Sequence, residues 1–346
     1  MTSRACSTLL VATIFLLSAC GCVSTLARRA ITPERARPDH DAKPLREALD
    51  EYRSTRDVRV AVGPPTATIV VSVIDPTEAS ATLVMSAGAR SLKIASQMKA
   101  APGSTSQPIK STQWTTDQPL RGTIFVLHGI SNCKDQAPYQ IWATALNLQG
   151  YRCVLLDLRG HGQSTGKYLS YGVTERHDLV QVLDALERQK LIAGPVGVLG
   201  ASYGGAVAIQ WAAIDPRVKA VVSLEPFSSF RAAVFDAAPL VLGRWQRFYP
   251  PEKIERVIRK AGEIGNFDPN EANPEAAIQI CSQPVLLIHG ENDELLSPDN
   301  SRRLHAAAPR NSALLIIPGV GHADLWFRAF QTIHEHAMGW FEEHLK

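Results

Sequence analysis

The sequence has 346 residues, of which 45% are hydrophobic and 20% are charged, and this composition is typical of a globular chain. The 36 Lys and Arg residues nearly balance the 33 Asp and Glu residues, and no basic stripe with interleaved aromatic residues is present, so nucleic acid is not an expected partner. The six cysteines are too few for a disulfide scaffold and form no C-x-x-C pair, which excludes a zinc ribbon.

The first 19 residues have the pattern of a secretory signal peptide. Arg4 supplies a positive charge, an apolar run extends from Leu9 to Leu17, and the first acidic residue is Glu34. The apolar run is too short for a permanent transmembrane helix, which needs about 20 residues. We therefore expect residues 1–19 to be removed, with an uncleaved N-terminal anchor as the alternative.

The segment Leu17-Ser18-Ala19-Cys20 resembles the lipobox of bacterial lipoproteins. This resemblance implies cleavage before Cys20 and a diacylglycerol on its sulfur, which attaches the protein to a membrane. Cys22 fits less well, because Ala19 and not a leucine stands three positions before it. Gly21 is not the aspartate that favours inner-membrane retention in some bacteria, so the implied location is the outer membrane of a bacterial envelope.

Residues 20–66 are predicted to form a membrane tether, because they are rich in arginine and proline. A flexible chain of this length reaches several nanometres at most. The folded domain is then expected over residues 67–346. Its first strand, Ala67–Ile74, is rich in β-branched residues and suggests an antiparallel opening to a sheet.

Six short apolar runs follow the first strand. Their continuous apolar character predicts strands buried on both faces of a parallel sheet, and helical stretches separate most of them. The runs are Ile124–Leu127, Cys153–Leu156, Val196–Leu199, Ala220–Leu224, Val285–Ile288 and Leu314–Ile317. This alternation predicts an α/β fold with a doubly wound, mostly parallel twisted sheet and helices on both faces.

About sixty residues between Leu224 and Val285 contain no clear buried strand. Intervals that long are often functional, so we expect a helical lid insertion at about residues 226–282, over the carboxyl edge of the sheet. A structural excursion on the side of the domain is the alternative. The aromatic residues of the interval predict an apolar acyl pocket under the lid; they are Phe227, Phe230, Trp245, Phe248 and Tyr249.

Two segments match G-x-S-x-G, namely Gly200–Gly204 around Ser202 and Gly162–Gly166 around Ser164. Ser202 directly follows a predicted buried strand and directly precedes an apolar helix, which is the strand–turn–helix context of a nucleophilic serine. Ser164 has no helix immediately after it. We therefore expect Ser202 to be the nucleophile and Ser164 to be a loop residue.

A serine nucleophile needs a base, and the base needs an acid to orient it. Asp293 and His322 follow consecutive predicted strands and so belong to the same edge of the sheet, in the order Ser, Asp, His. Glu225, at the end of the run Ala220–Leu224, is a second candidate for the acid.

These motifs together resemble the α/β-hydrolase fold family, in its serine-hydrolase branch with monoacylglycerol-lipase-like and serine-aminopeptidase-like enzymes. The motifs are Leu127-His128-Gly129, Asp157 to Gly162, the serine turn at Ser202, His289-Gly290-x-x-Asp293 and Gly321-His322. The resemblance implies that Ser202 is the nucleophile, Asp293 the acid and His322 the base. It also implies an oxyanion hole from the backbone N–H groups of Ile130 and Tyr203, and it places the acid at Asp293 rather than at Glu225.

The implied function is that of a monomeric serine hydrolase that cleaves a small-molecule carboxylic ester through an acyl-enzyme, with no cofactor. A peptidase or amidase with the same triad is one alternative. A binding lipoprotein that has lost its chemistry is another, although no triad member is missing.

Other residues with possible chemistry are expected to be structural. His128 and His161 lie in glycine-rich turns, and Cys133, Cys153 and Cys281 are expected to be buried fillers. An oxidised pair among these cysteines is the alternative, since envelope proteins can form disulfides. A metal site at His334-Glu335-His336 is not expected, because residues two apart on a helix do not face each other.

Overall fold

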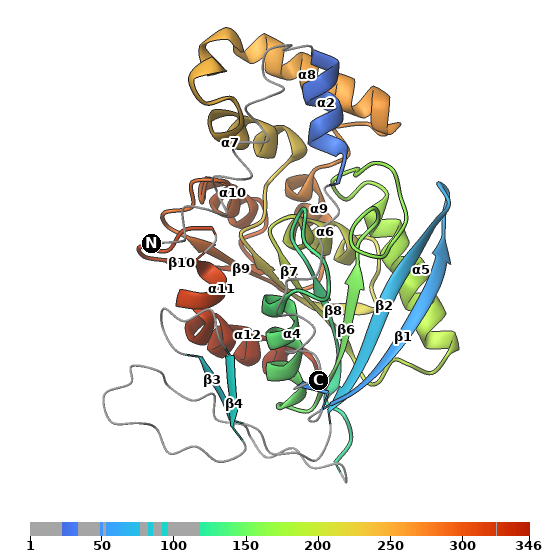
Figure 1. Cartoon of the computed structure of the whole chain (residues 1–346). Helices are drawn as coiled ribbons and strands as arrows, with labels where there is room; N and C mark the ends of the chain where they lie inside the picture. Colours follow the sequence, from blue (N-terminus) through green and yellow to red (C-terminus); the bar gives the residue numbers. More distant parts are fainter. Residues whose placement is uncertain are drawn as a thin grey trace.

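The computed structural model describes residues 23–33, 49–50, 53–76, 82–85, 92–95, 118–322 and 324–346 (Figure 1). The predicted signal peptide and Cys20 lie outside the described residues. Within the described part of the chain, no helix is both long enough and apolar enough to span a membrane.

The domain is built around an eight-stranded sheet with the order β1-β2-β6-β5-β7-β8-β9-β10. β1 and β2 are antiparallel to their neighbours, and every other pairing is parallel. The strands are β1 (Arg53–Val62), β2 (Ala67–Pro76), β5 (Gly122–Leu127), β6 (Tyr151–Asp157), β7 (Val196–Ala201), β8 (Val218–Leu224), β9 (Val285–Gly290) and β10 (Ser312–Ile317). A separate antiparallel pair joins β3 (Thr82–Met85) to β4 (Leu92–Ala95). The mostly parallel α/β sheet predicted from the sequence is confirmed.

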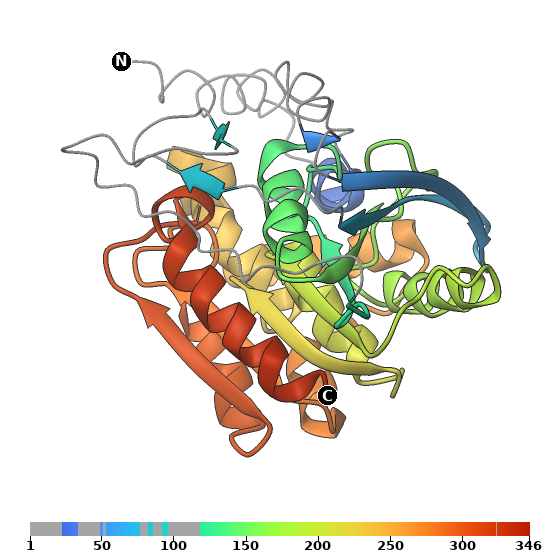
Figure 2. The same ribbon diagram turned by 90° about the horizontal axis from the view of Figure 1, so that it is seen from below.

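Helices cover both faces of the sheet (Figure 2). One core layer contains α4 (Ala137–Asn147), α11 (Leu325–Arg328) and α12 (Phe330–His344). The opposite layer contains α5 (Glu175–Arg188), α6 (Tyr203–Ala212), α9 (Pro274–Ile280) and α10 (Asp299–Ala307). Every residue of β5, β7 and β9 is buried, as their continuous apolar runs predict. β10 is only half-buried along its length, because it is an edge strand with one neighbour.

The predicted tether is wrong where the structure describes it. All ten residues of β1 pair with β2, from Arg53 opposite Pro76 to Val62 opposite Ala67. Helix α2 (Val23–Ile31) buries Ala27 and Ile31 completely and packs against α8 (Pro251–Gly265). The domain therefore begins before residue 67. The sequence of β1 lacks a continuous apolar run, because β1 is an edge strand and many of its charged side chains are exposed. Its hydrophobic pattern therefore does not predict a strand.

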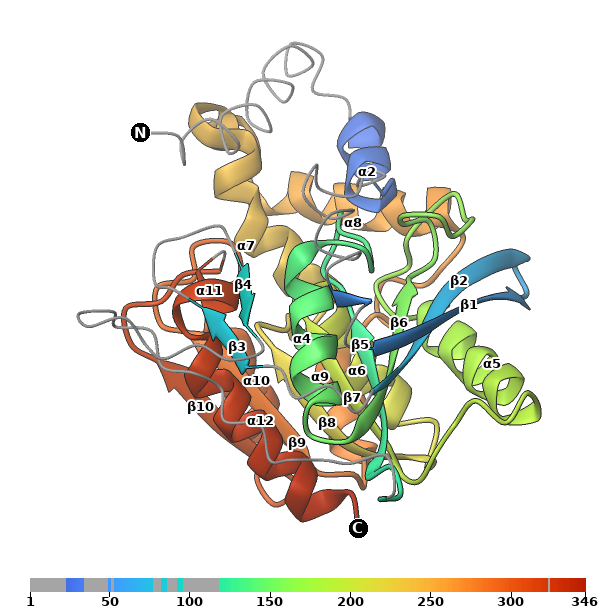
Figure 3. The same cartoon turned by 60° about the horizontal axis from the view of Figure 1, so that its bottom comes forward.

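The interval between β8 and β9 is helical, as predicted. It contains α7 (Phe230–Leu242), the 3-10 helix η1 (Gly243–Phe248), α8 and α9. Figures 1 and 3 show α7 and α8 beyond one end of the strands, with α2 beside α8. α9 instead packs against α6 and α10, so we use the term lid for α7, η1 and α8 alone.

Candidate active site

Four adjacent parallel strands bring the predicted site residues to one edge of the sheet. Ser202 follows β7, Glu225 follows β8, Asp293 follows β9 and His322 follows β10. Backbone hydrogen bonds join these segments in the same order. The N–H of Ser202 donates to the carbonyl of Leu224 at 2.6 Å, and the N–H of Glu225 donates to the carbonyl of Ile288 at 2.8 Å.

Ser202 occupies a strained turn between β7 and α6. Its φ of 49° and ψ of −112° lie where residues other than glycine rarely occur. The turn also needs glycine at its flanks. A Cβ atom on Gly200 would lie 2.4 Å from the carbonyl oxygen of Gly204, and one on Gly204 would lie 2.6 Å from that of Leu127. The G-x-S-x-G spacing thus allows the helix to start directly against the sheet.

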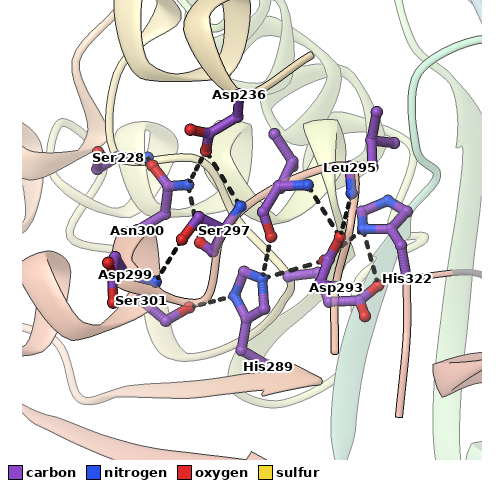
Figure 4. Close-up of polar contacts among 12 residues, drawn as sticks. Ser228, Asp236, His289, Asp293, Leu295, Ser297, Asp299, Asn300, Ser301 and His322 are labelled. Atoms are coloured by element: carbon purple, nitrogen blue, oxygen red, sulfur yellow. Dashed lines mark hydrogen bonds and ion pairs between the residues drawn. The ribbon is translucent and has the colours of Figure 1, made fainter. Parts of the chain in front are cut away.

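Asp293 and His322 form a close hydrogen bond, with 2.7 Å between Oδ2 and Nδ1 (Figure 4). The other carboxylate oxygen, Oδ1, accepts the N–H groups of Leu295 and Leu296, each at 2.9 Å. Burial alone would raise the pKa of Asp293, but hydrogen bonds from His289, His322 and the backbone hold that pKa well below its usual range. Asp293 is therefore a buried carboxylate that is ionised at neutral pH.

His289 is a buried partner of Asp293 that sequence reasoning did not assign. Its Nε2 lies 3.1 Å from Oδ2 of Asp293 and 2.9 Å from the carbonyl of Leu296, and its Nδ1 lies 2.8 Å from the hydroxyl of Ser301. The available signal was its place in the motif His289-Gly290-x-x-Asp293. Its partner Ser301 belongs to α10, twelve residues further along the chain.

A second set of hydrogen bonds fastens the lid to the segment after β9 (Figure 4). Asp236 of α7 accepts the N–H of Ser297 at 3.1 Å and the side-chain amide of Asn300 at 2.7 Å. The amide oxygen of Asn300 accepts the N–H of Ser228 at 2.9 Å. The base of the lid is thus connected to the element that contacts His289.

Glu225 also faces this group. Its side chain is almost fully buried, and Oε2 lies 3.4 Å from Nδ1 of His322. Burial, together with the negative charge of Asp293, raises the pKa of Glu225 to about 10. Glu225 is therefore neutral at pH 7, whereas Asp293 is ionised.

Glu225, Asp293 and His322 are the one group of potential metal ligands found among the described residues, with ligand atoms within 4.8 Å of one another. The hydrogen bond to Asp293 already uses Nδ1 of His322, and Glu225 is neutral. This donor set suits a hydrogen-bonded acid–histidine pair better than a cation.

The segment after β5 lies beside the serine turn. A Cβ atom on Gly129 would be 3.6 Å from Cβ of Ser202, so Ile130 is close to the serine. His128 holds this segment, because its Nδ1 donates to the carbonyl of Gly129 at 2.7 Å and its Nε2 accepts the N–H of Leu158 at 2.9 Å. Burial lowers the pKa of His128 to about 4, so this histidine is neutral. Tyr203 is the first residue of α6.

The other candidates occupy structural positions. Ser164 is buried, donates its hydroxyl hydrogen to the carbonyl of Asp157 at 2.6 Å and accepts the N–H of Val70 at 2.8 Å. His161 is buried, and burial lowers its pKa to about 3. His334 is buried, whereas His336 is exposed. The three described cysteines are buried, as expected, and none of them forms a disulfide: Cys133, Cys153 and Cys281.

An apolar pocket of about 240 Å³ lies between the lid, α2 and the segment after β5. The segment after β5 contributes Ile130, and α8 contributes Ile254 and Val257. The lining residues from α7 are Ala233, Val234, Ala237, Ala238, Val241 and Leu242. Three further lining residues come from α2, namely Leu26, Arg29 and Ala30. Arg29 is the only charged residue among those that line the pocket.

The sheet order and the serine turn define a class of protein. Residues 122–264 match the model of the α/β-hydrolase fold family. The chain has the α/β-hydrolase fold.

Curated relatives include both lipases and a peptidase. The chain is 29% identical over 206 residues to the uncharacterized protein YqkD of Bacillus subtilis, a match that covers 58% of this chain and 65% of the relative. It is 25% identical over 223 residues to dipeptidyl-peptidase 5 of Porphyromonas gingivalis, covering 60% of this chain and only 31% of that protein. It is 26% identical over 264 residues to a monoacylglycerol lipase of Mycolicibacterium smegmatis, covering 67% and 92%. The chain thus spans less than two thirds of the first two relatives.

Among solved structures, esterase Pf2001 of Pyrococcus furiosus superposes with a TM-score of 0.61 at 17% identity, over 91% of this chain and 98% of the esterase. At that identity the similarity supports the fold alone.

Proposed function

We propose that this hydrolase cleaves a carboxylic ester through an acyl-enzyme on Ser202, with His322 as base and Asp293 as acid. One observation carries the proposal. The Asp293–His322 hydrogen bond of 2.7 Å lies at the same sheet edge as the strained turn of Ser202. Such strain costs on the order of 1–3 kcal/mol and persists at sites where it serves function, which disfavours a binding protein that has lost its chemistry.

The hydrogen bond to Asp293 sets the tautomer of His322, because Nδ1–H donates to the carboxylate and Nε2 is left as the basic nitrogen. Nε2 takes the proton of the Ser202 hydroxyl as its oxygen attacks the acyl carbon. Asp293, ionised at neutral pH, stabilises the imidazolium that forms. The imidazolium then donates its proton to the leaving alcohol, and water hydrolyses the acyl-enzyme by the same steps.

The backbone N–H groups of Ile130 and Tyr203 are proposed to stabilise the oxyanion of the tetrahedral intermediate. Tyr203 is the first residue of α6, so its N–H has no partner within the helix and points to where negative charge develops. Removal of one such donor costs about 10²–10³ in rate in related sites.

The pocket favours an ester over a peptide. Its lining contains one arginine and no carboxylate, whereas the charged amine of a peptide N-terminus would be favoured by a carboxylate. An apolar wall next to Ile130 suits an acyl chain. The monoacylglycerol lipase among the relatives supports the same choice.

A series of p-nitrophenyl esters from acetate to octanoate, measured beside aminoacyl-anilides, tests this function. Each buried CH₂ contributes about 0.8 kcal/mol, so kcat/KM should rise about fourfold per CH₂ until the pocket is full. Faster hydrolysis of the anilides would overturn the ester assignment. A flat profile from acetate to octanoate would overturn the acyl pocket.

We also propose that the mature protein is lipidated at Cys20 and located at the outer membrane of a bacterial envelope, as the lipobox-like segment implies. The variant Cys20→Ala should lose both acylation and cleavage before residue 20. Mass spectrometry of the mature protein measures both, and an unmodified N-terminus in the wild type would overturn this assignment.

A further inference from the structure

Exposed apolar side chains gather at one end of the lid. Six large hydrophobic residues are exposed among the described residues, and four of them lie between residues 240 and 248: Leu240, Val241, Trp245 and Phe248. Trp245 is 39% exposed and Phe248 is 51% exposed, and their rings lie 5.8 Å apart. Such a cluster marks an interaction surface.

Cations accompany these aromatic rings. The guanidinium of Arg244 lies 5.3 Å from the ring centre of Trp245, and that of Arg247 lies 4.7 Å from that of Phe248. The ammonium of Lys253 lies 3.9 Å from the ring centre of Tyr249. From Ala237 to Lys253 the sequence contains two arginines, one lysine and one acidic residue, Glu252. The surface is therefore both apolar and basic.

Helix α2 adjoins the same surface. Its residues Leu26, Arg29 and Ala30 line the pocket together with Val241 and Tyr249, so α2 and the end of the lid enclose one opening. Hydrogen bonds to the loop before α5 hold α2 in place, including one of 3.1 Å from the guanidinium of Arg28 to the hydroxyl of Tyr168. The hydroxyl of Tyr171 donates to the carbonyl of Ala30 at 2.7 Å, and the N–H of Leu169 donates to the carbonyl of Ile31 at 2.8 Å. Arg28 and Arg29 are exposed and add positive charge.

The position of α2 along the chain gives a second, independent argument. α2 begins at Val23, three residues after Cys20. Even a fully extended chain spans only about 10 Å over three residues. A lipid on Cys20 would therefore hold the α2 side of the domain within about 10 Å of the membrane surface.

We propose that this docking face, formed by residues 240–249, Lys253 and the exposed arginines of α2, binds the surface of an anionic phospholipid bilayer. Trp and Phe side chains beside Arg and Lys suit the boundary between headgroups and acyl chains, and each cation near an anionic surface contributes about 1 kcal/mol. Aromatic residues and arginine are also enriched at protein interfaces, so composition alone does not choose between the two partners. The start of α2 three residues after Cys20 favours the bilayer. The pocket then opens toward the bilayer, and substrate acyl chains enter from it.

The test uses the full chain reconstituted in vesicles of phosphatidylcholine that contain brominated acyl chains and phosphatidylglycerol. Lipid bromine quenches tryptophan only where the ring reaches the bilayer. The wild type should be quenched, and Trp245→Phe should lose most of the quenched fraction while the face stays apolar. The control Trp340→Phe, on α12, should be quenched like the wild type. Equal quenching in the wild type and Trp245→Phe would overturn the proposal.

A second arm tests the charge. Arg244→Glu combined with Arg247→Glu should lower the ratio of docked to undocked domain at least tenfold, since each lost cation is worth about fivefold. The matched control combines Arg188→Glu with Arg310→Glu, two exposed arginines outside the docking face. Equal losses in both double variants would overturn the proposal. A third outcome would also overturn the proposal. If Trp245 is protected from quenching by iodide in solution but is not quenched by brominated lipid, a protein partner covers it. Neither arm needs catalysis, so the docking face and the hydrolase activity are tested separately.

Discussion

The serine turn and the end of the lid lie near the same pocket but are built in opposite ways. Around Ser202 the end of β7 lies against the start of α6, and the start of α6 lies against the end of β5. A methyl group added to Gly200 or Gly204 would therefore have no room. Between residues 240 and 248 the side chains are largely exposed, and a Cβ atom on Gly243 would meet nothing within 4 Å. Backbone packing thus fixes the position of the nucleophilic serine. The exposed side chains at the end of the lid are not constrained in this way, so their identities can vary between hydrolases.

The largest expected effect separates the two G-x-S-x-G serines. Ser202→Ala should lower kcat at least about 10⁴-fold and abolish fluorophosphonate labelling, because no other hydroxyl occupies the strained turn. Ser164→Ala should keep labelling and lose about 1–3 kcal/mol of unfolding free energy, since it leaves the buried N–H of Val70 unpaired. Labelling of Ser202→Ala but not of Ser164→Ala would reverse the assignment.

The packing of the turn predicts the next largest effect. Gly204→Ala would place a Cβ atom 2.6 Å from two carbonyl oxygens, those of Leu127 and His128. We expect a loss of about 3 kcal/mol or more in unfolding free energy, measured by urea denaturation. The control Gly339→Ala, at an exposed site in α12 with free space, should gain about 1 kcal/mol from helix propensity. A cost below 1 kcal/mol for Gly204→Ala would contradict the close approach.

Glu225 tests which carboxyl acts as the acid. Its folded pKa is raised to about 10, so its contribution to stability is fully present below the unfolded value of about 4.3 and is lost as pH rises toward 10. Glu225→Gln removes that loss. At pH 9 the variant should therefore be more stable than the wild type, by roughly 1–3 kcal/mol in urea unfolding.

The same variant should keep kcat within about tenfold, whereas Asp293→Asn should lose about 10⁴-fold, because an amide leaves His322 in the wrong tautomer. Steady-state kinetics on one ester measures both. A larger loss of kcat in Glu225→Gln than in Asp293→Asn would exchange the two roles.

The smallest effect is expected in the lid. Phe248→Ser should change the unfolding free energy by no more than about 0.5 kcal/mol, because half of the side chain is exposed. Thermal unfolding followed by circular dichroism measures this change. A loss comparable to that of Gly204→Ala would show that the end of the lid is packed as tightly as the serine turn.

The parts of the fold that follow from local patterns were predictable. Buried parallel strands are continuous apolar runs, and the turn at Ser202 is flanked by a strand and a helix within a few residues. β1 was not predicted, because four charged residues interrupt the apolar pattern of its one buried face. They are Arg53, Arg56, Asp57 and Arg59. The docking of α2 against α8 was missed too, because it joins segments more than two hundred residues apart. The contact of His289 with Ser301 likewise depends on where α10 packs.

The charged strand β1 protects the sheet from aggregation through its open edge. β2 is buried over most of its length, and only β1 separates it from the outer edge of the sheet. An uncovered apolar edge strand pairs readily with other chains, and charged edges prevent such pairing. A fragment that starts at Ala67 would expose Ile69 to Ile74 along its edge. Such a fragment should aggregate, because it lacks the strand whose arginines keep neighbouring molecules apart.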